Sequence, residues 1–103
     1  MSADPTESET VVERTVTIRN KRGLHARAAA KLVTVAERYA AEVELRGEAT
    51  GSEPGISARS IMGLMMLGAG IGTVLTVSGR GVDATAAVDA IAELVESGFA
   101  EQD

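Results

Sequence analysis

The stretch RTVTIRNKRGLHARAAAKLVTVAERY, residues 14–39, changes from the periodicity of a strand to that of a helix. Up to residue 19 polar and apolar side chains alternate, with Val16 and Ile18 on one face, which predicts a half-buried strand. A polar turn follows. From about residue 27 onward the larger apolar side chains recur at helical spacing. We therefore expect an alanine-rich helix that buries one face, formed by Leu32, Val35, Ala36 and Tyr39.

The rest of the chain predicts further elements of both kinds. Strands are expected over residues 42–46, near residues 56–57 and over residues 73–78, with a polar loop over residues 47–55. Helices are expected over residues 60–67 and 84–97, with Asp83 as N-cap and Gly98 as C-cap of the second. The order β-α-β-β-α-β-α predicts an α+β fold in which helices cover one face of an antiparallel sheet.

A length of 103 residues fits one domain. We expect an acidic N-terminal tail over residues 1–12, a folded domain over residues 13–99 and a short C-terminal tail over residues 100–103. The chain has no cysteine and one histidine, so neither a disulfide scaffold nor a metal site is expected, and no cofactor is implied. The N-terminus lacks the pattern of a signal peptide, and no apolar stretch is long enough to cross a membrane, so we expect a cytoplasmic protein without membrane insertion.

The positive charges of the chain are concentrated in one segment. Ten basic and fifteen acidic residues give a net charge of −5, yet residues 14–36 hold six of the bases and no acid. The only histidine, His25, lies in this segment. With one Tyr, one Phe and no Trp, the chain lacks aromatic side chains on which bases could stack, so nucleic-acid binding is not expected.

His25 stands where the turn becomes the helix. The first turn of a helix has unpaired N–H groups and the positive end of the helix dipole, and no Ser, Thr, Asp or Asn at positions 24–29 caps them. Imidazole is a competent nucleophile near pH 7, where its ordinary pKa of about 6.5 leaves it largely neutral. Arg27 is placed to steady phosphate oxygens. These features predict a phosphorylatable histidine; the alternative is a solvated histidine within a solubilising basic turn.

A second motif, ARSIMGLMML over residues 58–67, is unusually apolar for a short helix. Ser60 is in the position of its N-cap. The apolar side chains are too many for one face, so some are expected at the surface, where methionine makes adaptable contacts with partners. The alternative is that the small core accommodates most of them. The glycines of residues 68–72 follow a helix and precede a strand, which indicates a helix stop and turn and not a dinucleotide site.

The GLHAR run at residues 23–27 and the SIMGLMML run at residues 60–67 together resemble the HPr family of histidine phosphocarriers of the bacterial phosphoenolpyruvate-dependent phosphotransferase system. The resemblance covers about residues 13–99. It implies an open-faced sandwich, with three helices on one face of a four-stranded antiparallel sheet. It also implies a carrier, without independent turnover as an enzyme, that accepts a phosphoryl group from enzyme I and passes it to enzyme IIA-type domains.

The resemblance also implies roles for single residues. His25 would be phosphorylated on Nδ1, with the Arg27 side chain and the backbone N–H groups of Ala26 and Arg27 holding the phosphate. Ser60 matches a serine that an HPr kinase/phosphorylase modifies in some bacteria. The partner-docking residues would be Ile61, Met62 and Met65. Apart from the resemblance, we expect a monomer.

The sequence departs from the family pattern in two places. The family usually has Pro after the active-site arginine, where this chain has Ala28, and the loop over residues 47–55 is longer than expected. The motifs do not distinguish a sugar-uptake carrier from the nitrogen-branch carrier NPr. A second hypothesis assigns the chain to another class of protein. It would be an interaction module that docks partners through the Met-rich surface and is not phosphorylated.

Overall fold

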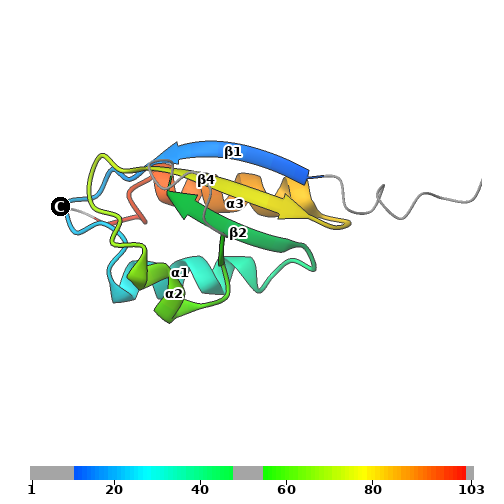
Figure 1. Ribbon diagram of the computed structural model, residues 1–103, viewed down its shortest axis with the longest axis horizontal. Coiled ribbons are helices and arrows are strands. Elements are labelled where there is room, and N and C mark those ends of the chain that lie inside the picture. Colours follow the sequence, from blue (N-terminus) through cyan, green and yellow to red (C-terminus); the bar gives the residue numbers. More distant parts are fainter. Residues whose placement is uncertain (1–10, 48–54, 102–103) are drawn as a thin grey trace, which may run out of the picture.

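The computed structural model describes residues 11–47 and 55–101. Along this part of the chain the predicted element order is confirmed (Figure 1). The elements are β1 (Val11–Thr17), α1 (Ala26–Ala36), β2 (Glu42–Gly47), β3 (Ile56–Ser57), α2 (Ile61–Met66), β4 (Val74–Arg80) and α3 (Ala84–Glu96). Residues 1–10, 48–54 and 102–103, which belong to the tails predicted over 1–12 and 100–103 and to the loop predicted over 47–55, lie outside the described residues.

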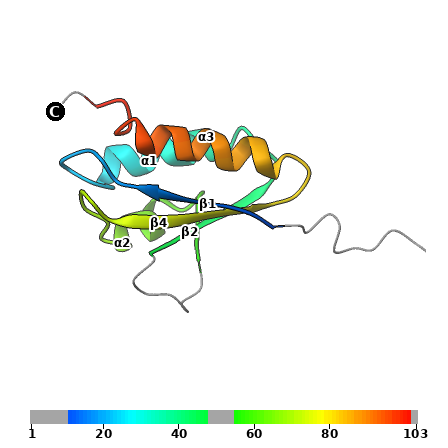
Figure 2. The ribbon, with the colours of Figure 1, turned by 90° about the horizontal axis from the view of Figure 1, so that it is seen from above.

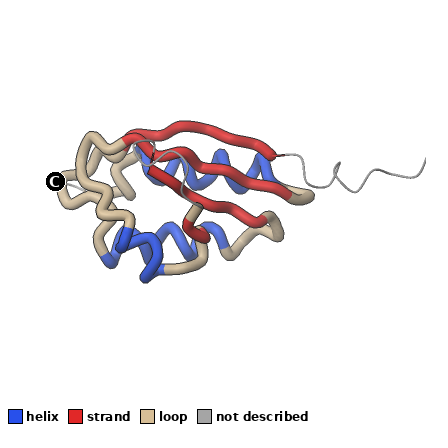
Figure 3. Tube along the Cα trace, in the orientation of Figure 1, coloured by secondary structure: helices blue, strands red, loops and turns tan. Residues whose placement is uncertain are grey.

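The strands form one antiparallel sheet in the order β1-β4-β2-β3 (Figure 3). The last strand, β4, therefore lies between β1 and β2, and Leu75 pairs with Val16 while Val77 pairs with Leu45. These inward side chains are almost fully buried. On the other face Glu13 accepts hydrogen bonds from Arg46 and Ser78, as expected for a polar, uncovered surface.

Two helices, α1 and α3, lie side by side on one face of the sheet (Figure 2), and α2 packs against α1 and β3. The core between the layers is aliphatic except for Phe99, which follows α3 and is completely buried. The architecture is the open-faced α+β sandwich that the sequence predicts. Within the described residues, none of the helices has the length and apolar character needed to cross a membrane.

Three predicted elements have boundaries that were wrong by more than one residue. The first strand, β1, spans Val11–Thr17 and not residues 14–19, so it begins within the segment predicted as a tail. The helix α1 ends at Ala36 and not at Tyr39, because the N–H groups of Arg38 and Tyr39 bond to carbonyls only three residues back, which tightens the chain into a turn. The strand β4 continues through Gly79 and Arg80, beyond its predicted end at residue 78, because both residues pair with β1 and β2. Glycine suits this strand, since a Cβ at Gly79 would lie 2.7 Å from the Val88 side chain.

Asp83 precedes α3 as predicted, but its side chain does not cap that helix. Its carboxylate instead accepts hydrogen bonds from the N–H groups of Ala40 and Ala41, at 3.0 and 2.8 Å. Asp83 therefore fixes the turn between α1 and β2. The C-cap of α3 is Ser97 and not Gly98, which follows it with a left-handed backbone, φ +72°. The helix ends there because Gly98 N–H bonds to Val95 O and Phe99 N–H bonds to Leu94 O.

Candidate functional site

The loop before α1 is held by the glycine-rich segment that precedes β4. Ile18 bonds through its N–H and C=O to Thr73 and Gly72, and the N–H of Leu24 donates to Ala69 O at 2.9 Å. Gly23 has φ +65°, and a Cβ there would lie 2.4 Å from Ala69 O. Only glycine fits this close approach, so the Gly before Leu24 and His25 sets the entry of the chain into α1.

His25 is the N-cap residue of α1. It has an extended backbone, with φ −77° and ψ 179°, and its carbonyl accepts the hydrogen bond from Ala29 N–H at 2.8 Å. Within the described residues, no backbone carbonyl or capping side chain accepts from the N–H groups of Ala26 and Arg27. Both residues are exposed. The positive end of the helix dipole is thus open to an anion beside the imidazole ring.

The fold brings an acidic side chain to this basic segment. Glu101, three residues beyond Gly98, accepts a short hydrogen bond at Oε2 from His25 Nε2, and its Oε1 accepts from Asn20 Nδ2 at 3.0 Å. The bond from His25 holds the pKa of Glu101 below its ordinary value, with Asn20 and the charge of Lys31 acting in the same direction against partial burial. Glu101 is therefore ionised at neutral pH.

A shallow groove of about 480 Å³ runs along α1 from Arg27 to Arg38. Its floor includes Ala30, Val35 and Leu94, and three cationic side chains, Arg27, Lys31 and Arg38, line it. Arg27 is exposed, and its guanidinium forms no ion pair with any described residue. The surface of α1 that begins two residues after His25 therefore carries positive charges with apolar side chains between them, which suits an acidic partner surface.

The second motif forms α2, which packs against α1. Ser60 is its N-cap, and its hydroxyl accepts a hydrogen bond from Gly63 N–H at 3.0 Å. Only Leu64 of the helix is buried. The other large side chains, those of Ile61, Met62, Met65 and Met66, are exposed, and Met65 and Met66 have exposed fractions of 41% and 80%. The small core does not accommodate them, and Met66 adds to the three residues that the sequence singled out.

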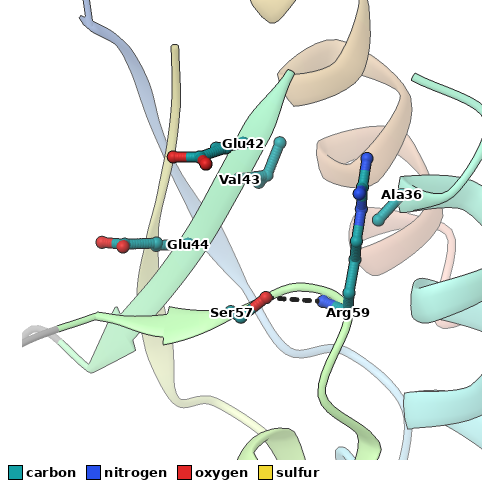
Figure 4. A pocket seen from close by; sticks show the side chains of 6 residues that line it. All are labelled: Ala36, Glu42, Val43, Glu44, Ser57 and Arg59. Atoms are coloured by element: carbon teal, nitrogen blue, oxygen red, sulfur yellow. Dashed lines mark hydrogen bonds between the residues drawn. The ribbon is translucent and has the colours of Figure 1, made fainter. Parts of the chain in front are cut away.

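A second depression, of about 280 Å³, lies beside β2 (Figure 4). It is lined by Ala36, Glu42, Val43, Glu44, Ser57 and Arg59. Arg59 is committed to the fold, because its guanidinium donates to Tyr39 O at 2.6 Å and its backbone N–H donates to the Ser57 hydroxyl at 3.1 Å. The depression contributes nothing to the surroundings of His25.

Sequence reasoning placed His25, Ala26 and Arg27 together but missed Glu101 and Asn20. Glu101 was assigned to a C-terminal tail, and it lies 76 residues from His25 in the sequence. One signal pointed to it, since the only Phe of the chain follows a helix-ending glycine, and a buried Phe99 requires the chain to turn back onto the core.

Comparisons with known proteins agree with this geometry. Residues 12–97 match the family model described as PTS HPr component phosphorylation site. The phosphocarrier protein NPr of Shewanella violacea is 48% identical over 92 residues, covering 89% of this chain and 97% of that protein. The phosphocarrier protein HPr of Cupriavidus necator is 42% identical over 91 residues, covering 88% and 98%.

The structural comparison leads to the same proteins. The crystal structure of HPr from Thermoanaerobacter tengcongensis superposes with a TM-score of 0.79 at 37% identity, covering 89% of this chain and 99% of that one. HPr from Bacillus anthracis gives 0.75 at 35% identity, covering 84% and 98%. The chain belongs to the HPr family of the phosphotransferase system.

Proposed function

We propose that this protein, a phosphocarrier of the phosphotransferase system, carries its phosphoryl group on Nδ1 of His25. The observation that supports this most directly is the position of His25 as N-cap of α1, beside the open N–H groups of Ala26 and Arg27. A phosphoryl group on the ring would meet two backbone donors, the helix dipole and the Arg27 guanidinium.

The donor is enzyme I and the acceptors are enzyme IIA-type domains, in the cytoplasm, with the carrier acting as a monomer. The phosphoryl group passes directly from one protein to the other, so the carrier must present its ring at an exposed docking surface. The cationic groove on α1 and the apolar residues Ile61, Met62 and Met65 on α2 form that surface. The charges favour rapid encounter with acidic partners, and the methionines fit surfaces of different shape.

The test is incubation with enzyme I and phosphoenolpyruvate. We expect one acid-labile phosphoryl group per chain, absent from His25→Ala. Arg27→Ala is expected to slow its acquisition, with Arg19→Ala, a change of equal charge in the strand-to-turn segment, as control. A wild-type chain that stays unlabelled with enzyme I of the same organism would exclude the proposal.

Partner binding that is unchanged in His25→Ala, without phosphohistidine in cells, would favour an interaction module. The IIA domain that accepts the group identifies the branch, sugar uptake or nitrogen regulation.

Ser60 is proposed as a second, regulatory phosphorylation site for an HPr kinase/phosphorylase. Its hydroxyl is occupied as the cap of α2, so a phosphate there would stay at the helix N-terminus and alter docking at the neighbouring methionines. We expect an acid-stable phosphate that persists in His25→Ala and disappears in Ser60→Ala. Because Ser60→Ala also removes a cap, Ser60→Asn, which can still cap, serves as the matched control; a kinase that labels Ser60→Asn acts on another residue.

A further inference from the structure

The C-terminal segment after α3 is built to reach back to His25. Phe99 and Ala100 both have left-handed backbones, with φ 58° and 59°, a conformation that is unfavourable for a residue with a Cβ. The segment is held in it by the burial of Phe99, by Lys31 Nζ bonding to Phe99 O at 2.7 Å, and by Glu101 N–H bonding to Gly98 O at 3.0 Å. Unfavourable backbone geometry that is held from several sides concentrates at functional sites.

Both carboxylate oxygens of Glu101 have partners in the His25 loop. Oε2 accepts from His25 Nε2, and Oε1 accepts from Asn20 Nδ2. Asn20 is 2% exposed, and the same amide nitrogen donates to Gly23 O at 2.8 Å. The side chains of His25 and Glu101 are only 17% and 13% exposed. Glu101 is thus fixed to the turn that carries His25, and the edge of the ring that contains Nε2 is covered.

An ionised carboxylate only accepts hydrogen bonds, so the bond to Glu101 requires the proton to be on Nε2. In the neutral ring the lone pair is then on Nδ1. We propose that Glu101 is a positioning residue, which selects the Nε2–H tautomer and thereby makes Nδ1 the nucleophile. This inference rests on the proposed phosphorylation of His25.

The transfer step balances with this proton in place. The Nδ1 lone pair forms the new bond to phosphorus, while the bond from phosphorus to the donor group of phospho-enzyme I breaks and its electron pair stays with that group. The His25 ring gains positive charge and keeps its proton on Nε2, where the Glu101 carboxylate stabilises it. Two cationic side chains of α1 lie near this site. Lys31 donates a hydrogen bond to Phe99 O, and Arg27 is exposed two residues after His25 and is free to contact the phosphate.

The experiment uses the full chain with Glu101→Ala and Glu101→Gln, and with Glu96→Gln as a control of equal charge change at an exposed residue of α3. His25 is the only histidine, so one imidazole is seen by ¹⁵N NMR. In the wild type we expect Nδ1 without a proton and a slowly exchanging proton on Nε2. Glu101→Ala should lose the slow exchange and acquire an Nδ1–H fraction, while Glu96→Gln should match the wild type.

Reaction with phosphoramidate then tests the chemistry without a protein donor, since its P–N bond breaks and ammonia leaves. We expect only Nδ1-phosphohistidine in the wild type and a mixture with the Nε2 isomer in Glu101→Ala, because Nε2 is then uncovered. With phospho-enzyme I, the single-turnover rate at saturation should fall about tenfold in Glu101→Ala, with binding to enzyme I unchanged. Glu101→Gln should lie between the two.

An unchanged isomer and an unchanged rate in Glu101→Ala would overturn the role of Glu101 while leaving phosphorylation of His25 intact. A wild-type chain that phosphoramidate labels but enzyme I does not would instead contradict the proposed donor. A wild-type ring with its proton on Nδ1 would overturn the inference regardless of either reaction.

Discussion

Lys31 on α1 donates a hydrogen bond from Nζ to the backbone carbonyl of Phe99, at 2.7 Å, and so ties the helix that begins at His25 to the segment that follows α3. We expect Lys31→Met to loosen residues 98–101 without unfolding the domain, because Phe99 stays buried. A lost hydrogen bond of about 1 kcal/mol corresponds to roughly fivefold faster amide exchange in this segment. Hydrogen-exchange mass spectrometry measures it, with Arg38→Met, also on the groove, as the control that should leave the segment unchanged. Equal amide exchange of residues 98–101 in both variants would contradict a stabilising role of the Lys31–Phe99 hydrogen bond.

Gly23 and Gly70 lie close together but differ in what a side chain would meet. At Gly23 the left-handed backbone and the 2.4 Å approach to Ala69 O both oppose a Cβ, whereas a Cβ at Gly70 meets nothing within 4 Å and its φ is not positive. We expect Gly23→Ala to lower the free energy of unfolding by about 2–4 kcal/mol. Gly70→Ala should change it by less than about 1 kcal/mol. Urea denaturation compares them, and similar losses in both variants would refute the argument.

Asp83 makes stability depend on acid pH. The N–H of Ala40 is the largest cause that holds its pKa below the ordinary value, with partial burial opposing it and the N–H of Ala41 adding to the lowering. A carboxylate whose pKa is lower in the folded state stabilises the fold above its unfolded pKa, and this stability is lost as the pH falls through the folded pKa. We expect Asp83→Asn to be less stable than the wild type at pH 7 and to approach it below about pH 4.

The measurement is the free energy of unfolding from pH 7 down to pH 2. Asp89→Asn is the control, because Asp89 forms only an exposed ion pair with Arg14 and should cost little at any pH. A difference between Asp83→Asn and the wild type that stays constant down to pH 2 would show that the carboxylate is not the source.

The sequence predicted the layers, the strand order along the chain and the helix start at His25, because hydrophobic period and capping patterns are local. It did not predict the Glu101 contact with His25, which depends on two left-handed residues and a Schellman turn that bend the chain back. Nor did it predict that the Asp83 carboxylate accepts hydrogen bonds from the turn before β2 and does not cap α3. Both contacts join residues that are far apart in the chain. For such pairs the sequence does not indicate which of its many carboxylates accepts the hydrogen bond.

Ala28 stands where the family usually has proline, and the structure explains why either residue suits the position. Ala28 is the third residue of α1, and no carbonyl of the described chain accepts from its N–H, so a proline there removes no hydrogen bond. We expect Ala28→Pro to raise the free energy of unfolding by about 0.5–1 kcal/mol, because it restricts the unfolded chain. Ala29→Pro is the matched control: Ala29 N–H bonds to His25 O at 2.8 Å, and its loss should cost about 3 kcal/mol or more. Thermal and urea unfolding measure both, and a comparable loss in Ala28→Pro would mean that the buried Ala28 site has no room for the ring.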